Sequence, residues 1–215
     1  MALDGPGGGS YAGRVQATAS ELSRRRLLWL LGSSCGVLFG ACKRSAELPE
    51  LGGIGAFSLT DQAGRAVTAE SLRGRVWAAA FMFTRCPTVC PRITRRMRDL
   101  QRAAKNDGIE LDLVSFSVDP EHDTPEVLRA YAQKYEADLE SWRFLTGDLE
   151  VVRRTSEQGF KLALQGKPTA GVEHFGLMHG SHLVLVDRAG QIRGYYRTSE
   201  DEAMKQLLSD AEALG

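Results

Sequence analysis

The chain has 215 residues, of which 27 are basic and 27 acidic, with 43% apolar and 25% charged side chains. This length predicts one globular domain with a short additional segment, and the apolar fraction is that of a protein with a folded core. The balanced charge argues against a nucleic-acid-binding protein, the lack of any run of 18 apolar residues excludes a polytopic membrane protein, and four cysteines are too few for a disulfide scaffold.

Residues 1–45 are predicted to be a flexible leader that acts as an export signal or a membrane anchor. The first 22 residues are rich in Gly, Ala and Ser and show no periodicity. Arg24, Arg25 and Arg26 then precede fifteen uncharged residues, 27–41. Basic residues before a short apolar run are typical of an export signal. The arginines also resemble a twin-arginine signal.

Cys42 is a candidate site of lipid attachment, because small residues precede it at 40 and 41, as in a bacterial lipoprotein cleavage site. Two alternatives stay open: an uncleaved membrane anchor and release by secretion, with Cys42 incidental in both. Cys35 lies within the apolar run and is interpreted as a small buried residue. All three alternatives place the folded domain outside the cytoplasm, on the periplasmic side of a bacterial inner membrane.

Residues 46–215 are predicted to form one α/β domain. The segment 57–59 is interpreted as an edge strand that leads into a hairpin turn at 61–64, and the continuous apolar run 76–83 as a strand buried on both faces. Further strands are expected at 109–118, 143–145, 182–186 and 192–196, the last two joined by a hairpin turn at 187–190. Helices are expected at 90–105, 124–135 and 148–158 and from 199 to near the end of the chain, and a longer loop at 165–178. Strands that alternate with helices predict a sheet with helices on both faces.

Two helix starts have clear capping signals. Thr124 is expected to be the N-cap of a helix, with Pro125 at its first position and Glu126 in its first turn. Residues 199–202, Ser-Glu-Asp-Glu, have the spacing of a capping box and are expected to begin the last helix.

Cys86 and Cys90 are the most informative pair in the chain, because they lie four residues apart where a buried strand leads into a helix. Unpaired N–H groups and the helix dipole at such a position favour the thiolate form, and Arg85 adds a neighbouring positive charge. Residues i and i+4 share a helix face, at a spacing close to that of a disulfide and suited also to two sulfurs on one metal ion. The pair therefore predicts either a reversible disulfide or a soft-metal site. A purely structural disulfide would close a short loop and stabilise the fold only modestly.

His179 is the candidate third ligand, because it immediately precedes the strand at 182–186, and sites in open α/β sheets lie between loops at strand ends. Two thiolates and one imidazole suit Cu(I) and also accept Cu(II), whereas zinc would require a fourth ligand. Spacing alone leaves a structural role for His179 open, and His182 is the alternative ligand. His122 and His174 are interpreted as solvated or locally bonded, and Asp119 as a turn residue that is structural or near the site.

Four segments resemble the Sco/SenC family: 83–91, 117–128, 142–147 and 179–190. They occur in consistent order, and the similarity covers about 51–212. The resemblance implies a thioredoxin-like fold with a central mixed sheet, an N-terminal hairpin and flanking helices. It also implies a membrane-tethered domain that binds one copper ion and helps to assemble the dinuclear copper centre of cytochrome c oxidase.

The family's ligands, two cysteines and a histidine, fall on Cys86, Cys90 and His179. His179 is preferred to His182 because it stands eleven residues before the hairpin glycine, Gly190. The implied partners are the copper-accepting oxidase subunit and other copper chaperones. The chain departs from the family at two positions, with Phe83 where Tyr is frequent and Thr88 where Asp is frequent.

Two functions are compared. The first is a metallochaperone that passes Cu(I) from this site to an acceptor. The second is an extracytoplasmic thiol-disulfide oxidoreductase or a peroxidase, in which Cys86 attacks and Cys90 resolves, with a Cys86–Cys90 disulfide as the oxidised form. The spacing exceeds Cys-x-x-Cys by one residue, and residues 178–181 lack the proline typical of such enzymes. Both features favour the metallochaperone.

Overall fold

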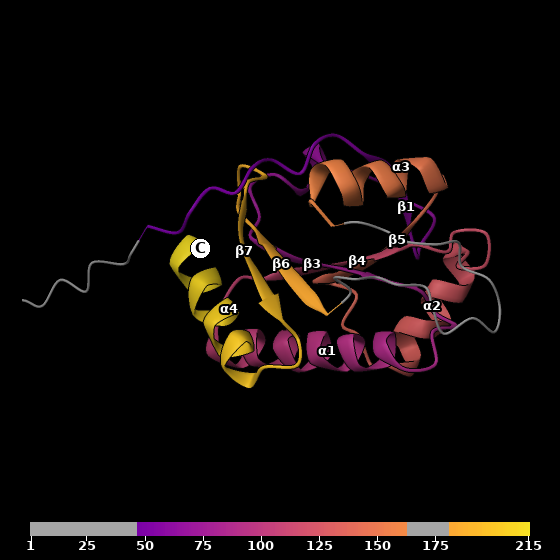
Figure 1. Cartoon of the computed structure of the whole chain (residues 1–215). Helices are drawn as coiled ribbons and strands as arrows, with labels where there is room; N and C mark the ends of the chain where they lie inside the picture. Colours follow the sequence, from indigo (N-terminus) through magenta and orange to yellow (C-terminus); the bar gives the residue numbers. More distant parts are fainter. Residues whose placement is uncertain (1–46, 163–180) are drawn as a thin grey trace, which may run out of the picture. The chain divides into compact units, whose positions relative to one another are not determined.

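The computed structural model describes residues 47–162 and 181–215, and residues 1–46 and 163–180 lie outside the described part. The described strands form one mixed sheet in the order β2-β1-β5-β4-β3-β6-β7 (Figure 1). Their bounds are β1 (Ser58–Asp61), β2 (Ala66–Thr68), β3 (Trp77–Met82), β4 (Asp112–Ser117), β5 (Trp142–Thr146), β6 (His182–Val186) and β7 (Ile192–Arg197). The predictions for the leader, for Cys35 and Cys42, and for the loop at 165–178 fall outside the described residues.

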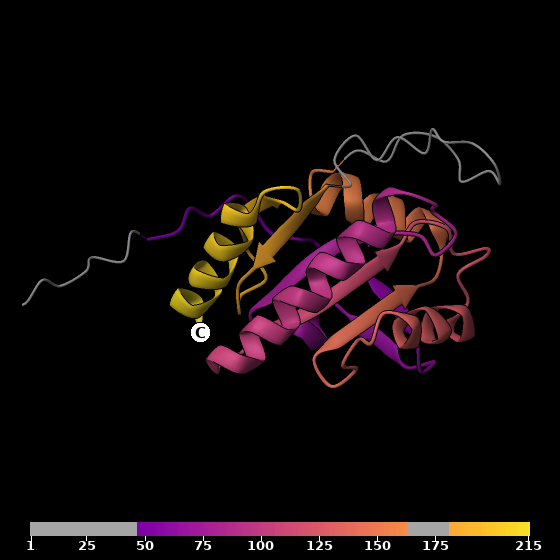
Figure 2. The same ribbon diagram turned by 90° about the horizontal axis from the view of Figure 1, so that it is seen from below.

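Helices cover both faces of this sheet, as the alternation of strands and helices predicts. α1 (Val89–Asp107), α2 (Pro125–Lys134) and α4 (Asp201–Leu214) lie on one face, with α1 between the other two (Figures 1 and 2). α3 (Leu149–Arg154) lies on the other face and continues into a π-helical turn (Thr155–Gly159). The short 3₁₀ helix η1 (Glu70–Leu72) follows β2. No helix within the described ranges is long and apolar enough to cross a membrane.

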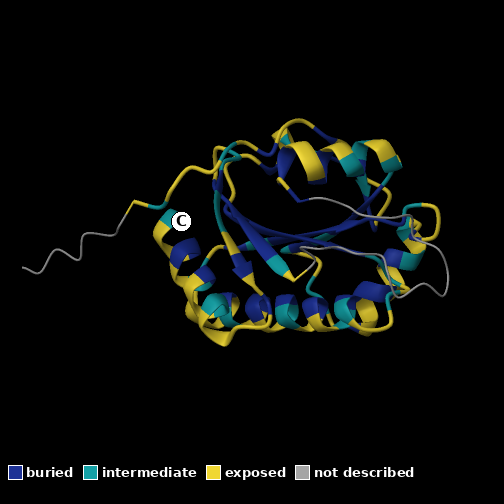
Figure 3. Ribbon diagram, viewed as in Figure 1, coloured by how far each residue is buried: buried dark blue, intermediate teal, exposed yellow. Residues whose placement is uncertain are grey.

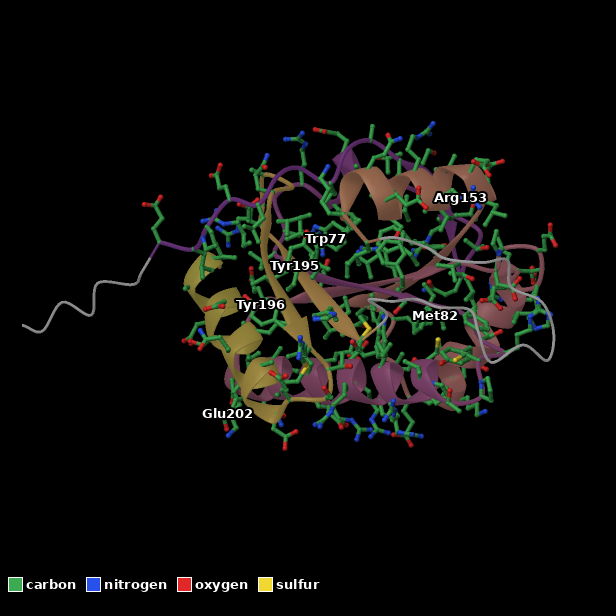
Figure 4. All side chains as sticks on the ribbon, in the orientation of Figure 1. Trp77, Met82, Arg153, Tyr195, Tyr196 and Glu202 are labelled. Atoms are coloured by element: carbon green, nitrogen blue, oxygen red, sulfur yellow. The ribbon has the colours of Figure 1, made fainter. Side chains whose placement is uncertain are left out.

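β3 is the centre of the fold because it contributes to both hydrophobic cores. All six of its residues are buried, and Figure 3 shows the strands as the buried layer between exposed helix surfaces. Side chains alternate along a strand, so Met82 packs with α1, α2 and α4, whereas Trp77 packs with the aromatic cluster on the α3 side (Figure 4). β3 pairs with β4 in parallel and with β6 antiparallel. The ends of β3 and β4 and the start of β6 therefore lie at one edge of the sheet.

Two local predictions are wrong. β1 is not an edge strand, because β5, more than 80 positions later, pairs with it on the side opposite β2. A short-range pattern carries no information about such a distant neighbour. The capping box also fails: α4 begins at Asp201, its N-cap is Glu200, and no side chain caps it. Thr198 bonds back to the Ser181 carbonyl through both its N–H and its hydroxyl, so the chain is still tied to β6 where the capping box would begin.

The capping signal at Thr124 is confirmed. The hydroxyl of Thr124 accepts the Val127 N–H at 3.4 Å, with Pro125 at the first helical position. Asp148 caps α3 by accepting the Val151 N–H at 2.9 Å.

The beginning of the described chain is tied to the β6–β7 hairpin. The Leu51 N–H donates to the Ile192 carbonyl, and the Ile192 N–H donates to Gly52, both at 2.8 Å. The Arg193 guanidinium donates to the carbonyls of Leu48 and Pro49. Because β6 is antiparallel to β3, this hairpin lies at the end of the sheet opposite the end of β3.

Candidate metal and thiol site

Cys86 and Cys90 lie together at the carboxyl end of β3, as predicted. β3 ends at Met82, and a loop of residues 83–88, the cysteine loop, leads into α1. The Cys90 N–H donates to the Cys86 Sγ, with 3.4 Å between nitrogen and sulfur. The two sulfurs are not bonded to each other; Cys86 is half-buried and Cys90 is buried.

The two cysteines do not share a helix face, so the i, i+4 helix spacing does not describe their geometry. α1 begins at Val89, so Cys90 is its second residue, whereas Cys86 lies in the preceding loop and donates its N–H to the Phe83 carbonyl. The residue before a proline is disfavoured in the helical conformation, and Pro87 follows Cys86. The Cys86 sulfur therefore faces the first N–H groups of α1 from outside the helix.

This position makes Cys86 acidic. Hydrogen bonds lower its pKa to about 5, first that from the Cys90 thiol and then those from the backbone N–H groups of Cys90, Thr88 and Val89, against the opposing effect of burial. The bond to Cys86, together with burial, raises the pKa of Cys90. At neutral pH the pair is therefore one thiolate held by one thiol.

Arg85, which adds a positive charge next to Cys86 in the sequence, forms an ion pair with Asp119. Its Nε lies 2.5 Å from Oδ2 of Asp119, whose side chain is only 2% exposed. The hydrogen bonds described above, rather than the Arg85 charge, are the main cause of the low Cys86 pKa. Asp119 thus fixes the cysteine loop to the turn after β4. It lies next to the site and also forms hydrogen bonds within its own turn.

Asp123 is a site residue that the sequence analysis missed. It is completely buried. Its Oδ2 accepts the Thr84 N–H at 3.0 Å and the Ser117 hydroxyl at 2.5 Å, and its Oδ1 accepts the Thr84 hydroxyl at 2.5 Å. A buried carboxylate is stable only with such donors. The available signal was an acidic residue four positions after Asp119, between a buried strand and a helix.

The backbone carbonyl of Cys90 is also held by a polar side chain. The Thr94 hydroxyl donates to the Cys90 carbonyl and lies 2.9 Å from the Tyr131 hydroxyl. Tyr131 belongs to α2 and is buried, which raises its pKa. The first turn of α1 is therefore fixed to α2.

The predicted histidine ligand, His179, lies outside the described residues, as does His174. His182 is the first residue of β6, is half-buried and stands opposite Arg197 of β7. His122 is exposed in the turn after β4 and donates its backbone N–H to the Asp119 carbonyl. Among the described residues, no three His, Cys, Asp or Glu side chains gather as a metal site.

The two cysteines have the chemistry required for a soft metal ion. Thiolate sulfur is the donor that Cu(I) prefers. Cys86 is already ionised at neutral pH, so only Cys90 has to release a proton on metal binding. The half-buried Cys86 leaves one side of the pair open. These two sulfurs are two of the three donor atoms that the sequence predicts for a metal ion.

Comparisons with known proteins agree with this geometry. Residues 47–212 match the SCO1/SenC family model. A SCO1/SenC family lipoprotein from Bacillus anthracis superposes with a TM-score of 0.69 at 34% identity, over 76% of this chain and 95% of that one. BsSco, a Sco-family cytochrome c oxidase assembly protein in which a disulfide switch was identified, superposes with a TM-score of 0.68 at 32% identity, over 78% and 96%.

Copper-bound ScoI from Bradyrhizobium japonicum is also similar, with a TM-score of 0.56 and 25% identity over 76% of this chain and 99% of that one. These likenesses confirm the predicted thioredoxin-like fold, with its mixed sheet and flanking helices.

Proposed function

Because the chain belongs to the SCO1/SenC family, we propose that it is a copper metallochaperone that delivers copper to the dinuclear centre of cytochrome c oxidase during assembly. The observation that carries the proposal is the acidic, half-buried Cys86 beside the buried Cys90. Copper-bound ScoI and the oxidase-assembly role of BsSco, both members of this fold, support it.

The proposed ligands are Cys86, Cys90 and His179. Ser181 and Val89 line the same groove, so the chain that enters β6 passes close to the start of α1. His179 is two positions before Ser181, and two residues span about 7 Å when extended. This reach supports His179 as the third ligand.

Delivery would proceed by ligand exchange at the open side of the pair. An acceptor thiolate approaches the half-buried Cys86, and sulfur ligands are exchanged one at a time. Cys90, whose pKa is raised, takes up a proton as the cargo leaves. The copper is Cu(I) in this scheme, and the same ligand set also accepts Cu(II).

Thiol-disulfide exchange is the second candidate, favoured by the same low pKa. The Cys86 thiolate would attack a partner disulfide and form a mixed disulfide. Cys90 would then attack Cys86, lose its proton, and release the partner as two thiols with a Cys86–Cys90 disulfide left behind. The disulfide switch found in BsSco supports a reversible bond of this kind.

We place the domain outside the cytoplasm, tethered to the inner membrane or exported by residues 1–45, with Cys42 as the proposed site of lipid attachment. The similar protein from Bacillus anthracis is a lipoprotein, which supports the tethered form. Labelling with a radioactive fatty acid tests it: Cys42→Ser should abolish the label, whereas Cys35→Ser should retain it. A label that survives Cys42→Ser contradicts lipidation at this position.

The copper site is tested by anaerobic Cu(I) titration of the reduced full chain in mild detergent. We expect one Cu(I) per chain, no tight binding after Cys86→Ser or Cys90→Ser, and at least tenfold weaker binding after His179→Ala. His182→Ala is the matched control and should bind as the wild type does. Unchanged affinity after His179→Ala would show that the ligand assignment is wrong.

A disulfide-reductase assay separates the two candidate functions. A chaperone should turn over general disulfide substrates slowly, with or without copper. Rapid turnover by the copper-free protein, lost in Cys86→Ser, would favour the oxidoreductase.

A further inference from the structure

α1 is a basic helix in an acidic domain. It has six basic and two acidic residues, whereas residues 45–215 together have 21 basic and 25 acidic residues. Figure 4 shows nitrogen-bearing side chains along the outer side of α1. The basic residues are Arg92, Arg95, Arg96, Arg98, Arg102 and Lys105.

The two ends of α1 differ in how these charges are neutralised. At the carboxyl end, Arg102 pairs with Glu136 at 2.5 Å and Lys105 with Asp138 at 2.9 Å. Near the cysteines, Arg92 and Arg95 are exposed, and neither forms an ion pair with any other residue in the described ranges. Unneutralised positive charge is therefore concentrated at the end of α1 next to the thiols.

This charge is placed where it disfavours the helix. Arg92, Arg95 and Arg96 have the i, i+3, i+4 spacing of one helix face, where like charges repel. Of these three, only Arg96 has an ion-pair partner among the described residues, Asp201 at 2.6 Å. α1 also has no acid in its first turn, whereas α2, α3 and α4 each have one or two. The stability of the helix does not explain the arrangement, whereas an anionic partner would neutralise these charges.

A groove of about 400 Å³ runs beside these arginines. Its lining includes the half-buried Val89, next to Cys90, together with Arg92, Arg95, Ser181 and Ser199. The groove thus offers guanidinium groups, hydroxyls and an apolar contact next to Cys90. The carboxylate of Asp99, which also lines the groove, pairs with Arg98 at 2.9 Å.

We infer that this groove docks an acidic segment of the protein that exchanges copper or disulfides with the cysteine pair. The inference rests on the proposed function, because it names the chemistry of that function's partner. A carboxylate-rich segment would form ion pairs with Arg92 and Arg95, which have no ion-pair partner within residues 47–162 and 181–215, and would hold the partner's thiols beside Cys86. A concave groove admits a polypeptide segment, whereas an anionic membrane would meet only its rim, so we favour a protein partner.

The test uses two synthetic acceptor peptides with the same Cys-x-x-x-Cys core, one flanked by Asp and Glu and the other by Asn and Gln. Cu(I) transfer from the reduced, loaded full chain in detergent is followed by stopped-flow spectroscopy. We expect transfer to the acidic peptide to be about tenfold faster at low salt, because opposite charges steer association. This preference should fade in ~0.5 M salt.

Matched variants locate the effect. Arg92→Gln/Arg95→Gln should reduce the rate for the acidic peptide to that for the neutral peptide, without changing the amount of Cu(I) bound. Arg102→Gln/Lys105→Gln removes the same charge from the other end of α1 and should keep the preference. Equal rates for both peptides, or an equal loss in the control variant, would overturn the inference.

Two further measurements separate docking of an acidic peptide from copper transfer and from binding to a lipid surface. A thiol-free acidic peptide, with Ser in place of Cys, should bind the wild type in fluorescence anisotropy and lose about tenfold in affinity with Arg92→Gln/Arg95→Gln. This binding measurement tests docking in the groove independently of copper. If the chain takes up no Cu(I), only the copper proposal is refuted. If the double variant instead loses binding only to phosphatidylglycerol vesicles, the groove serves a lipid surface and the inference is wrong.

Discussion

The β6–β7 hairpin turn and the cysteine loop are both organised by a buried aspartate, but from different distances along the chain. In the hairpin, Asp187 Oδ1 accepts the N–H groups of Ala189 and Gln191 at 2.9 Å, and Oδ2 accepts Arg193 at 2.8 Å. All of these partners lie within six positions. In the cysteine loop, Asp123 binds Thr84 from 39 positions away.

The hairpin turn is therefore held by hydrogen bonds within its own short segment, whereas the cysteine loop is held by a residue that is distant in the sequence. The β1–β2 turn repeats the local arrangement, because Asp61 accepts the N–H groups of Ala63 and Arg65 at 2.8 and 2.9 Å. The shape of the cysteine loop depends on the parallel pairing of β3 with β4, which brings Asp123 in the following turn to Thr84. Its geometry therefore responds to changes at the start of α2.

The largest expected effect comes from removing the hydrogen bonds between Asp123 and the cysteine loop. Asp123→Ala leaves the Thr84 N–H and the Ser117 hydroxyl without their buried acceptor, so we expect unfolding free energy to fall by about 3 kcal/mol. Urea denaturation measures the loss, and hydrogen exchange should show faster opening at residues 84–90. Asp123→Asn keeps the shape and one acceptor oxygen and should lose less. A loss from Asp123→Ala no greater than that from Asp187→Ala would contradict the comparison.

The second prediction concerns the acidity that the loop geometry produces. Alkylation of Cys86, followed by mass spectrometry of its peptide, should rise with pH and reach half its maximal rate near pH 5, because the thiolate is the reactive form. Cys90→Ala removes the leading hydrogen-bond donor and should move this midpoint upward, whereas Cys90→Ser retains a donor and should move it less. A wild-type midpoint near the usual ~8.5 would contradict the geometry.

The same shift has a consequence for stability. The pKa of Cys86 in the folded state lies below its value in an unfolded chain, so the thiolate favours folding above that higher value. This contribution is lost as the pH falls through about 5.

A smaller effect is expected at the hairpin. Asp187→Ala removes three local hydrogen bonds, but water reaches this turn more easily than it reaches Asp123. We expect a loss of about 1.5 kcal/mol in urea denaturation and no change in the Cys86 alkylation profile. A change in that profile would show that the two ends of the sheet are coupled.

The smallest effect is expected at Gly190 of the same turn. Its φ of +77° is a left-handed conformation that disfavours any residue with a Cβ, although a Cβ here would meet nothing closer than Ile54 at 3.9 Å. Gly190→Ala should therefore lower stability by about 1 kcal/mol through the backbone alone. Gly190→Asn, which tolerates this conformation better, is the control. Equal losses in the two variants would point to a steric cause.

Much of this protein follows from local sequence patterns. The apolar run at 76–83 predicts the buried β3, Thr124-Pro125 predicts the start of α2, and the Asp-to-Gly turn predicts the β6–β7 hairpin. The proximity of Cys86 and Cys90 also follows, because the chain turns from a strand into a helix over this short segment. Each of these features depends on backbone preferences and contacts within a few positions.

The tertiary structure decided everything that depends on strand pairing and on the path of the chain before α1. It placed the Cys86 sulfur against the first N–H groups of α1, directed Arg85 to Asp119, buried Asp123 beneath the cysteine loop, and paired β1 with β5. The partners in the last three cases are 34 to 86 positions apart. The first two contacts form because the parallel strands β3 and β4 end at a common edge of the sheet, and the third is an antiparallel strand pairing. No short window of sequence contains either relation.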